Sequence, residues 1–347
     1  MAHRLPLRRP VGTPSLHYYS RFVVAWTLLL ILAGSFVTST ESGLSVSDWS
    51  TTYGQNMFTF PPSKMVGGIF YEHGHRLIAS GVGVLTLGLA LWLWFADGRR
   101  WTRWLGVGAL AMILAQGVLG GITVLFFLPP AVSTAHAGLA ELFFCATVAI
   151  ALFTSAGWSA EYGLSTATDD ARLRLIATST TVLVYAQILI GATMRHIGAG
   201  LAIPDFPLMF GHIMPDHWSA AIGVHFAHRV TAMIVTMAVA TTSIYIWRRH
   251  RDRQELTRPA ALLVFLLKVQ MTLGGLTVLS GRAAWINSLH VVCGALVLTT
   301  SLVITLRSWR GSFAYHERME PQRTQTTQRA EQGFGSVRLQ PDRRGPA

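Results

Sequence analysis

The chain has 347 residues, of which 51% are hydrophobic and only 13% are charged. A soluble domain carries about 25% charged residues, so this composition excludes an ordinary soluble protein and indicates that most of the chain lies in a lipid bilayer. The formal net charge is +12, but the arginines lie in short groups between apolar runs and form no single basic face, so we expect no nucleic-acid partner.

A helix needs about 20 apolar residues to cross a hydrocarbon core about 30 Å thick. The N-terminus lacks the cleavage site of a signal peptide, so the first apolar run is predicted to be an uncleaved helix. Together the apolar runs predict an all-α integral membrane fold with eight transmembrane helices, at residues 20–39, 69–96, 102–125, 131–155, 173–194, 218–247, 259–280 and 285–307.

Arginine-rich segments alternate with arginine-poor segments along the chain. The N-terminal tail and the loops after the second and sixth helices are rich in arginine, so both termini are predicted to face the cytoplasm. The loops at about 40–68 and 195–217 then lie outside. The expected organisation is an N-terminal cytoplasmic tail, a four-helix half, a cytoplasmic linker, a second four-helix half and a disordered cytoplasmic tail, at residues 1–19, 20–155, 156–172, 173–310 and 311–347.

The two four-helix halves repeat each other in sequence. Residues 72–76 (Glu-His-Gly-His-Arg) recur as residues 225–229 (His-Phe-Ala-His-Arg), and the Gln-x-x-Leu-Gly-Gly-x-Thr-Val-Leu that begins at Gln116 recurs at Gln270. Each half has an even number of spans and so enters the membrane in the same direction, which predicts a pseudo-two-fold axis along the membrane normal. Two further matches pair His136 with His290 and Asp48-Trp49 with Asp205-Phe206.

Four histidines lie one or two turns inside the even-numbered helices, at similar depth near the outer face. Polar side chains are expensive in a bilayer and indicate function. Two facing imidazoles in a helical bundle suit an axially ligated haem, whereas a zinc or copper cluster needs all four to converge within about 4 Å. The repeat favours two separate haem sites, formed by the pairs His75/His136 and His228/His290.

Charged residues accompany the first histidine of each pair. Arg76 and Arg229 either pair with a haem propionate or extend toward the outer headgroups. Glu72 shares a helix face with His75 and stands where the second half has His225. It is an acid–base or electrostatic group, an orienting partner of the histidine, or an interfacial carboxylate facing water. This break in the repeat indicates that the halves have different functions.

Other polar residues give weaker signals. The two Gln-x-x-Leu-Gly-Gly stretches are typical of helix-packing seams. Lys268 lies in the middle of a predicted span and Glu141 lies one turn past His136, but the sequence suggests a partner for neither. The remaining histidines at the outer edge or in loops are secondary candidates: His73, His196, His212, His217 and His225.

Taken together, these motifs resemble the haem A synthase family over about residues 20–307. The resemblance implies an oxidoreductase that converts the C8 methyl of haem O to the formyl group of haem A, by successive hydroxylation and loss of water. It implies a haem b cofactor on His228 and His290, a haem O substrate site at His75 and His136, and a catalytic role for Glu72. The implied partners are haem O synthase, cytochrome oxidase assembly factors and membrane lipid.

The chain departs from the family pattern in its first outer loop. Some members carry a cysteine pair there, whereas Cys145 and Cys293, the two cysteines of this chain, lie in apolar segments. Ser47 also replaces a proline that the second half retains as Pro204. Neither departure touches the expected ligands.

Two other functions share the histidines: a dihaem electron-transfer cytochrome, and a haem transporter or chaperone. No flavin, nicotinamide or iron–sulfur motif indicates an electron donor. The arginine-rich N-terminal tail is short for a mitochondrial targeting segment, so a bacterial plasma membrane is favoured over the mitochondrial inner membrane.

Overall fold

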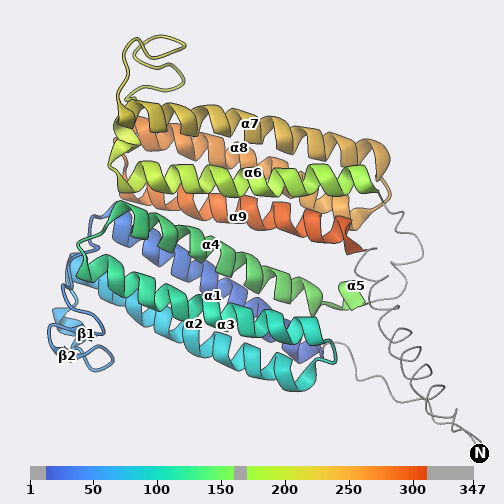
Figure 1. The fold of residues 1–347 in the computed structure, drawn as a ribbon, viewed down its shortest axis with the longest axis horizontal. Helices are drawn as coiled ribbons and strands as arrows, with labels where there is room; N and C mark the ends of the chain where they lie inside the picture. Colours follow the sequence, from blue (N-terminus) through green and yellow to red (C-terminus); the bar gives the residue numbers. More distant parts are fainter. Residues whose placement is uncertain (1–12, 160–169, 311–347) are drawn as a thin grey trace, which may run out of the picture.

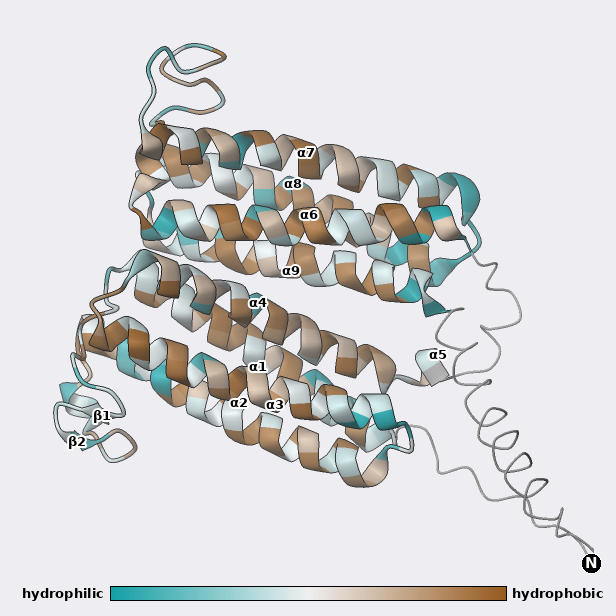
Figure 2. Cartoon of the chain, in the orientation of Figure 1, coloured by the Kyte–Doolittle hydropathy of each residue, from teal (hydrophilic) through white to brown (hydrophobic). Residues whose placement is uncertain are grey.

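The structure is a computed structural model that describes residues 13–159 and 170–310. Its described part contains eight helices long and apolar enough to cross a membrane, which confirms the predicted class and number of spans (Figures 1 and 2). The predicted tails before residue 13 and after residue 310, and most of the linker, lie outside the described residues. The helices are α1 Pro14–Ser39, α2 Gly68–Ala96, α3 Arg100–Leu125, α4 Pro130–Phe153, α6 Ala171–His196, α7 Ala220–Arg249, α8 Gln254–Leu279 and α9 Ala284–Ser308.

Two helices begin five or six residues earlier than hydropathy alone predicts. The first begins six residues before the predicted start because Thr13 caps it: its hydroxyl accepts from the backbone N–H of Leu16, and Pro14 takes the first helical position. Helix α8 continues through Pro259. A proline has no N–H for the carbonyl four residues earlier, and here that carbonyl, of Glu255, accepts from the Arg307 guanidinium instead.

The two long loops, residues 40–67 and 197–219, lie at the same end of the helices, called the loop end below (Figure 1). The first contains an unpredicted hairpin of β1 (Thr51–Thr52) and β2 (Gln55–Asn56). The remaining short elements are η1 Pro62–Lys64, α5 Ala156–Ser159 and η3 Ala199–Leu201.

Helices α1–α4 form one four-helix unit and α6–α9 a second one beside it (Figure 1). Contacts within the first unit, α1 with α2 and α4, and α3 with α2 and α4, recur within the second as α6 with α7 and α9, and α8 with α7 and α9. The units meet through α1 and α4 on one side and α6 and α9 on the other. The pseudo-two-fold axis relating the units stays a prediction.

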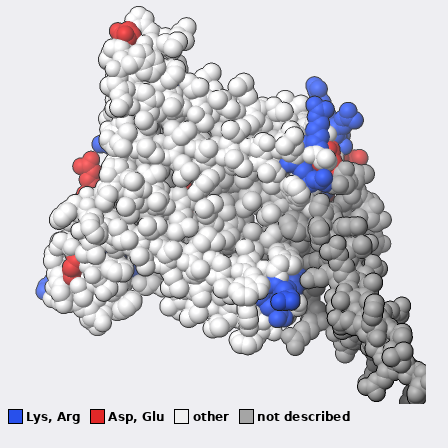
Figure 3. All heavy atoms as spheres, in the orientation of Figure 1, with Lys and Arg blue, Asp and Glu red and all other residues white. Residues whose placement is uncertain are grey.

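The outer surface of the bundle suits a bilayer. Lysine, arginine and acidic side chains lie at the two ends of the helices in Figure 3, and the wide band between them is nearly free of charge. Large apolar side chains such as Phe95, Val84 and Leu114 are exposed on the helices. Such a surface would be an aggregation liability in water, and is what hydrocarbon requires.

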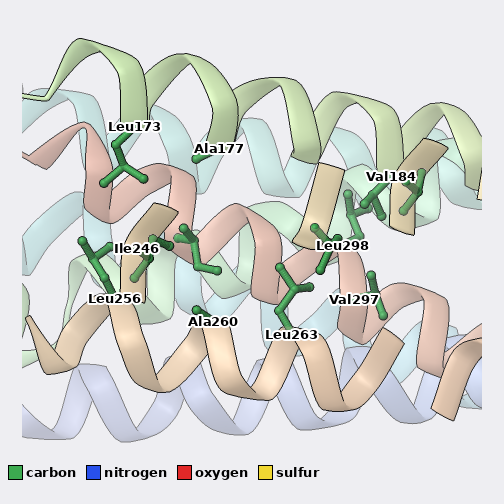
Figure 4. Packing of buried hydrophobic residues seen from close by; sticks show 12 residues of the cluster. Leu173, Ala177, Val184, Ile246, Leu256, Ala260, Leu263, Val297 and Leu298 are labelled. Atoms are coloured by element: carbon green, nitrogen blue, oxygen red, sulfur yellow. The ribbon is translucent and has the colours of Figure 1, made fainter. Parts of the chain in front are cut away.

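Close packing holds the second unit together. Its buried cluster joins four helices, with Leu173 from α6, Ile246 from α7, Leu263 from α8 and Leu298 from α9 (Figure 4). Lipid is as apolar as these side chains, so the stabilisation comes from packing contacts rather than from exclusion of water.

Leu263 and its neighbour Leu262 test this view of the core. Leu263→Ala leaves a cavity, because the leucine is fully buried, and is expected to destabilise the protein by about 2–5 kcal/mol. Leu262→Ala removes a side chain that is 49% exposed and is expected to change stability by less than about 0.5 kcal/mol. Thermal unfolding in detergent measures both, and equal effects would contradict the described packing.

Candidate functional site

The first pair of predicted histidines lies about two turns from the loop end of α2 and α4, each against a glycine of a neighbouring helix. A Cβ placed on Gly34 of α1 would lie 2.9 Å from Cε1 of His75, and one on Gly120 of α3 would lie 3.4 Å from Cε1 of His136. Glycine therefore allows each imidazole to approach the helix backbone closely.

The second pair has the same arrangement in the other unit. A Cβ on Gly191 of α6 would lie 2.8 Å from Cε1 of His228, and one on Gly274 of α8 would lie 3.1 Å from Cε1 of His290. The structure thus places the two histidines of each pair in one unit, on helices that both pack against the same two neighbours: α2 and α4 against α1 and α3, and α7 and α9 against α6 and α8. It also shows four glycines that the sequence did not single out, called the glycine seats below: Gly34, Gly120, Gly191 and Gly274. Gly120 and Gly274 occupy equivalent positions in the two halves, and this match was the sequence signal for a shared role.

The histidines have buried ring nitrogens that suit a ligand role. Nδ1 of His75, of His136 and of His290 is buried and has no hydrogen-bond partner, a state that costs about 1–3 kcal/mol for a polar group. Among the described residues, no group of three or more His, Cys, Asp or Glu side chains could hold a metal ion. Two imidazoles in each unit are the donor set of an axially ligated haem.

Glutamines of the Gln-x-x-Leu-Gly-Gly stretches lie beside the histidines. Nε2 of Gln116 donates to the backbone oxygen of His136 (2.8 Å), and Nε2 of Gln270 lies 3.4 Å from Nε2 of His290. The sequence analysis treated these stretches as packing seams only. They also position histidines, because the glutamine and the glycine one turn later face the same neighbouring helix.

A third glutamine binds one histidine alone. Nε2 of Gln187 on α6 donates to the backbone oxygen of His228 (2.9 Å) and lies 3.1 Å from its Nδ1. The equivalent position in the first unit, 157 residues earlier, is Leu30. The repeat gives no signal for Gln187, because matches between the halves reveal shared residues and this residue is a difference between them.

Each long loop is built around an aspartate that binds a tight turn. The Asp48 carboxylate accepts from the backbone N–H groups of Tyr53 (2.8 Å) and Gly54 (2.9 Å), and both of these residues have positive φ. Asp205 binds the turn at residues 210–211 in the same way. Although its burial opposes the change, the hydrogen bonds that Asp48 accepts, that from Gly54 foremost, lower the pKa of its carboxyl to about 2.

Arg76 fixes the first loop to α2. Its guanidinium donates to the backbone oxygens of Val46 (2.9 Å), Asp48 (2.7 Å) and Thr51 (3.1 Å), and to the carboxylate of Glu72 (2.6 Å). The planar fork of arginine suits this set of diverging acceptors. The sequence analysis considered only propionate pairing or extension to headgroups, and the structure adds this third role.

Arg229 does the same for the second loop. It donates to the backbone oxygens of Ile203 (3.3 Å), Asp205 (2.6 Å) and Leu208 (2.9 Å). Pairing of the two arginines with haem propionates stays a prediction. Their observed contacts place a structured loop over the loop end of α2 and another over that of α7.

Glu72 and His225 occupy equivalent places and accept equivalent hydrogen bonds. Oε2 of Glu72 accepts from the backbone N–H of Val46 (2.8 Å), and Nδ1 of His225 accepts from that of Ile203 (3.3 Å). Glu72 is only 4% exposed and also holds Arg76. The two units therefore share this loop contact, but only the first places a carboxylate there.

The second glycine of each Gly-Gly pair receives an aromatic side chain from the loop. A Cβ on Gly275 would lie 2.8 Å from Cε1 of Phe206, and one on Gly121 would overlap the indole of Trp49. The two consecutive glycines of each pair therefore have different tasks. One seats a histidine and the next seats a loop residue that covers the same end of the unit.

The weaker candidates lie apart from these contacts. His73 is buried against the first loop, where its Nδ1 lies 2.9 Å from the hydroxyl of Thr52. Glu141 is buried in α4 with Oε2 unpartnered, whereas Lys268 is exposed on α8. His217 lies in the second loop beside Asp216 (2.6 Å).

The fold and the site define a multi-pass membrane protein with one two-histidine site in each of two four-helix units. Residues 17–302 match the family model COX15-CtaA, which is described as cytochrome oxidase assembly protein. Because the match covers most of the chain, this protein belongs to that family.

Curated bacterial proteins are similar over nearly the same region. The haem A synthase of Geobacillus kaustophilus is 25% identical over 302 residues, covering 85% of this chain and 93% of the relative. That of Shouchella clausii is 29% identical, covering 74% and 84%. That of Halalkalibacterium halodurans is 25% identical, covering 84% and 96%. The relatives therefore match this chain through both four-helix units.

The glycine seats can be tested by adding a methyl group. Gly191→Ala places a Cβ against His228 and is expected to lower the haem retained by the purified protein, because the imidazole must move. Gly223→Ala on α7 is the control, since a Cβ there meets nothing within 4 Å. The haem-to-protein absorbance ratio measures both, and equal haem content in the two variants would refute the proposed seat.

Proposed function

We propose that this protein is a haem A synthase that oxidises the C8 methyl of haem O to the formyl group of haem A. The observation that carries the proposal is the pair of glycine-seated histidine sites, one in each unit, within a chain of the COX15-CtaA family. The names of the curated relatives support the same activity. A bound haem iron would supply the redox chemistry.

The second unit is proposed to hold haem b on His228 and His290 as a permanent cofactor. Gln187 supports this assignment, because its side-chain amide donates to the backbone oxygen of His228 and lies against the imidazole, so it restricts the position of the ring. A restrained ligand holds its iron in one geometry. The first unit has Leu30 at that position, which suits a site that must accept and release its occupant.

The first unit is proposed to hold haem O on His75 and His136, with Glu72 as the acid–base or electrostatic group of this substrate site. Glu72 shares a helix face with His75, and its carboxylate is oriented by Val46 and Arg76. Arg76 also keeps the first loop against α2, which helps to exclude water from that end of the site.

The protein is proposed to lie in the bacterial plasma membrane with both termini in the cytoplasm. Arginines gather at the end of the helices opposite the loops, as Figure 3 shows for one face, and the positive-inside rule places such an end in the cytoplasm. Haem O is the proposed substrate, and haem O synthase and oxidase assembly factors are the proposed partners.

Pigment analysis tests the activity. When the protein is co-expressed with a source of haem O, extracted pigments are expected to contain the mass of haem A. His75→Ala is expected to abolish haem A while leaving the haem b spectrum, whereas His228→Ala removes that spectrum. If a fully loaded protein yields only haems B and O, the synthase proposal is wrong and a dihaem electron-transfer cytochrome takes its place.

Glu72→Gln tests the asymmetry between the units. Glutamine keeps an acceptor for the Val46 N–H but loses the charge, so conversion is expected to fall by about 10²-fold or more with the haem b spectrum intact. Glu41→Gln is the control, because the side chain of Glu41 is 81% exposed. Loss of the haem b spectrum in Glu72→Gln would instead make Glu72 a structural residue.

A further inference from the structure

Two consecutive residues, Arg195 and His196, end α6 at the junction between the units. Nη2 of Arg195 donates to the backbone oxygen of Ser35 (2.8 Å) and to the hydroxyl of Ser39 (2.8 Å), both on α1. An arginine of the second unit is therefore anchored on the first. In Figure 1, α1 and α4 lie on one side of this junction and α6 and α9 on the other.

Ser39 extends this contact to α9. Its hydroxyl lies 3.0 Å from that of Ser288 and 3.3 Å from Nδ2 of Asn287, and Ser288 is two residues before His290. The polar contacts thus join the loop ends of α6, α1 and α9, about one turn nearer the loops than Gly34 and Gly191, the glycines against His75 and His228. They hold the Arg195 guanidinium in one place.

The contacts of Arg195 place it next to the histidine pair of the second unit. It stands four residues, about one helical turn, after Gly191, the glycine that lies against His228. Ser39, which accepts from its guanidinium, lies 3.0 Å from Ser288, two residues before His290.

The charge of Arg195 is not neutralised nearby. No carboxylate of the described residues forms an ion pair with it, and the charged group that acts on it is another arginine, Arg282. Arg282 itself is 38% exposed and pairs with Glu41 at 3.4 Å. A fixed positive charge with no nearby anion favours the reduced form of a neighbouring redox group, because the reduced form carries one more electron.

The repeat places no cation at the equivalent position of the first unit. Arg195 corresponds to Thr38, 157 residues earlier, and His196 corresponds to Ser39. The positive charge beside the histidines is therefore a feature of one unit, as the Glu72 carboxylate is of the other.

We propose that Arg195 is a positioning residue that raises the reduction potential of the haem bound by His228 and His290. Its guanidinium, enclosed between the units and anchored on Ser35 and Ser39, acts on this site through its charge. The inference rests on the proposed function, because it requires a haem at that histidine pair.

Spectroelectrochemical titration of haem b in the purified full-length protein tests the proposal. Arg195→Gln removes the charge and is expected to shift the midpoint potential to a lower value. Arg195→Lys keeps the charge and is expected to stay close to the unmodified protein. Arg282→Gln is the matched control, and its shift is expected to be smaller than that of Arg195→Gln because Arg282 is exposed and paired.

An unchanged potential in Arg195→Gln at full haem content would overturn the proposal, as would equal shifts in the glutamine and lysine variants. If Arg195→Gln does not retain haem, Arg195→Met provides the test, because it also removes the charge and keeps an unbranched side chain. The potential is then expected to fall, and an unchanged value would overturn the proposal. A protein whose haem b spectrum survives His228→Ala would refute the proposed function itself, before Arg195 is considered.

Discussion

A histidine inside a bilayer needs space for a flat ring between close-packed helices, and a glycine of the neighbouring helix provides that space. At each of the four sites a glycine removes the Cβ that the imidazole would otherwise strike. Glutamine side chains lie beside His136, His228 and His290. A helix that seats a ring cannot rotate without losing the seat. The histidine-bearing helices α2, α4, α7 and α9 therefore pack in fixed orientations against the glycine-bearing helices α1, α3, α6 and α8.

The loops depend on the same helices. Arg76 directly follows His75, and Arg229 directly follows His228. One helical turn therefore supplies both an imidazole directed into the unit and a guanidinium directed toward the loop. Each arginine holds loop carbonyls, and the aromatic residue after each loop aspartate packs on the second glycine of a Gly-Gly pair. Each loop is thus held over its site by contacts with the helices of its own unit, and not by a separate domain.

Differences between the repeated units carry as much information as their similarities. Glu72 opposes His225, Leu30 opposes Gln187 and Thr38 opposes Arg195. A duplicated scaffold supplies two sites of one shape, and these few substitutions give them different charge and rigidity. The first unit holds a buried carboxylate, whereas the second holds a restrained histidine and a fixed cation.

Much of this molecule is determined by its sequence alone. Eight apolar runs, the repeat and four histidines at equivalent positions predict the spans and the pairing of the histidines, because bilayer thickness sets helix length and polar groups in lipid are rare. The observed helix boundaries differ from the predicted ones where local chemistry overrides hydropathy, as at the Thr13 cap and at Pro259. Only the tertiary structure showed the glycine seats, the hydrogen bonds of Gln187 and the anchoring of Arg195 on Ser39. These contacts join helices far apart in sequence, and hydropathy and spacing report which side chains lie in the membrane but not which neighbour each one meets.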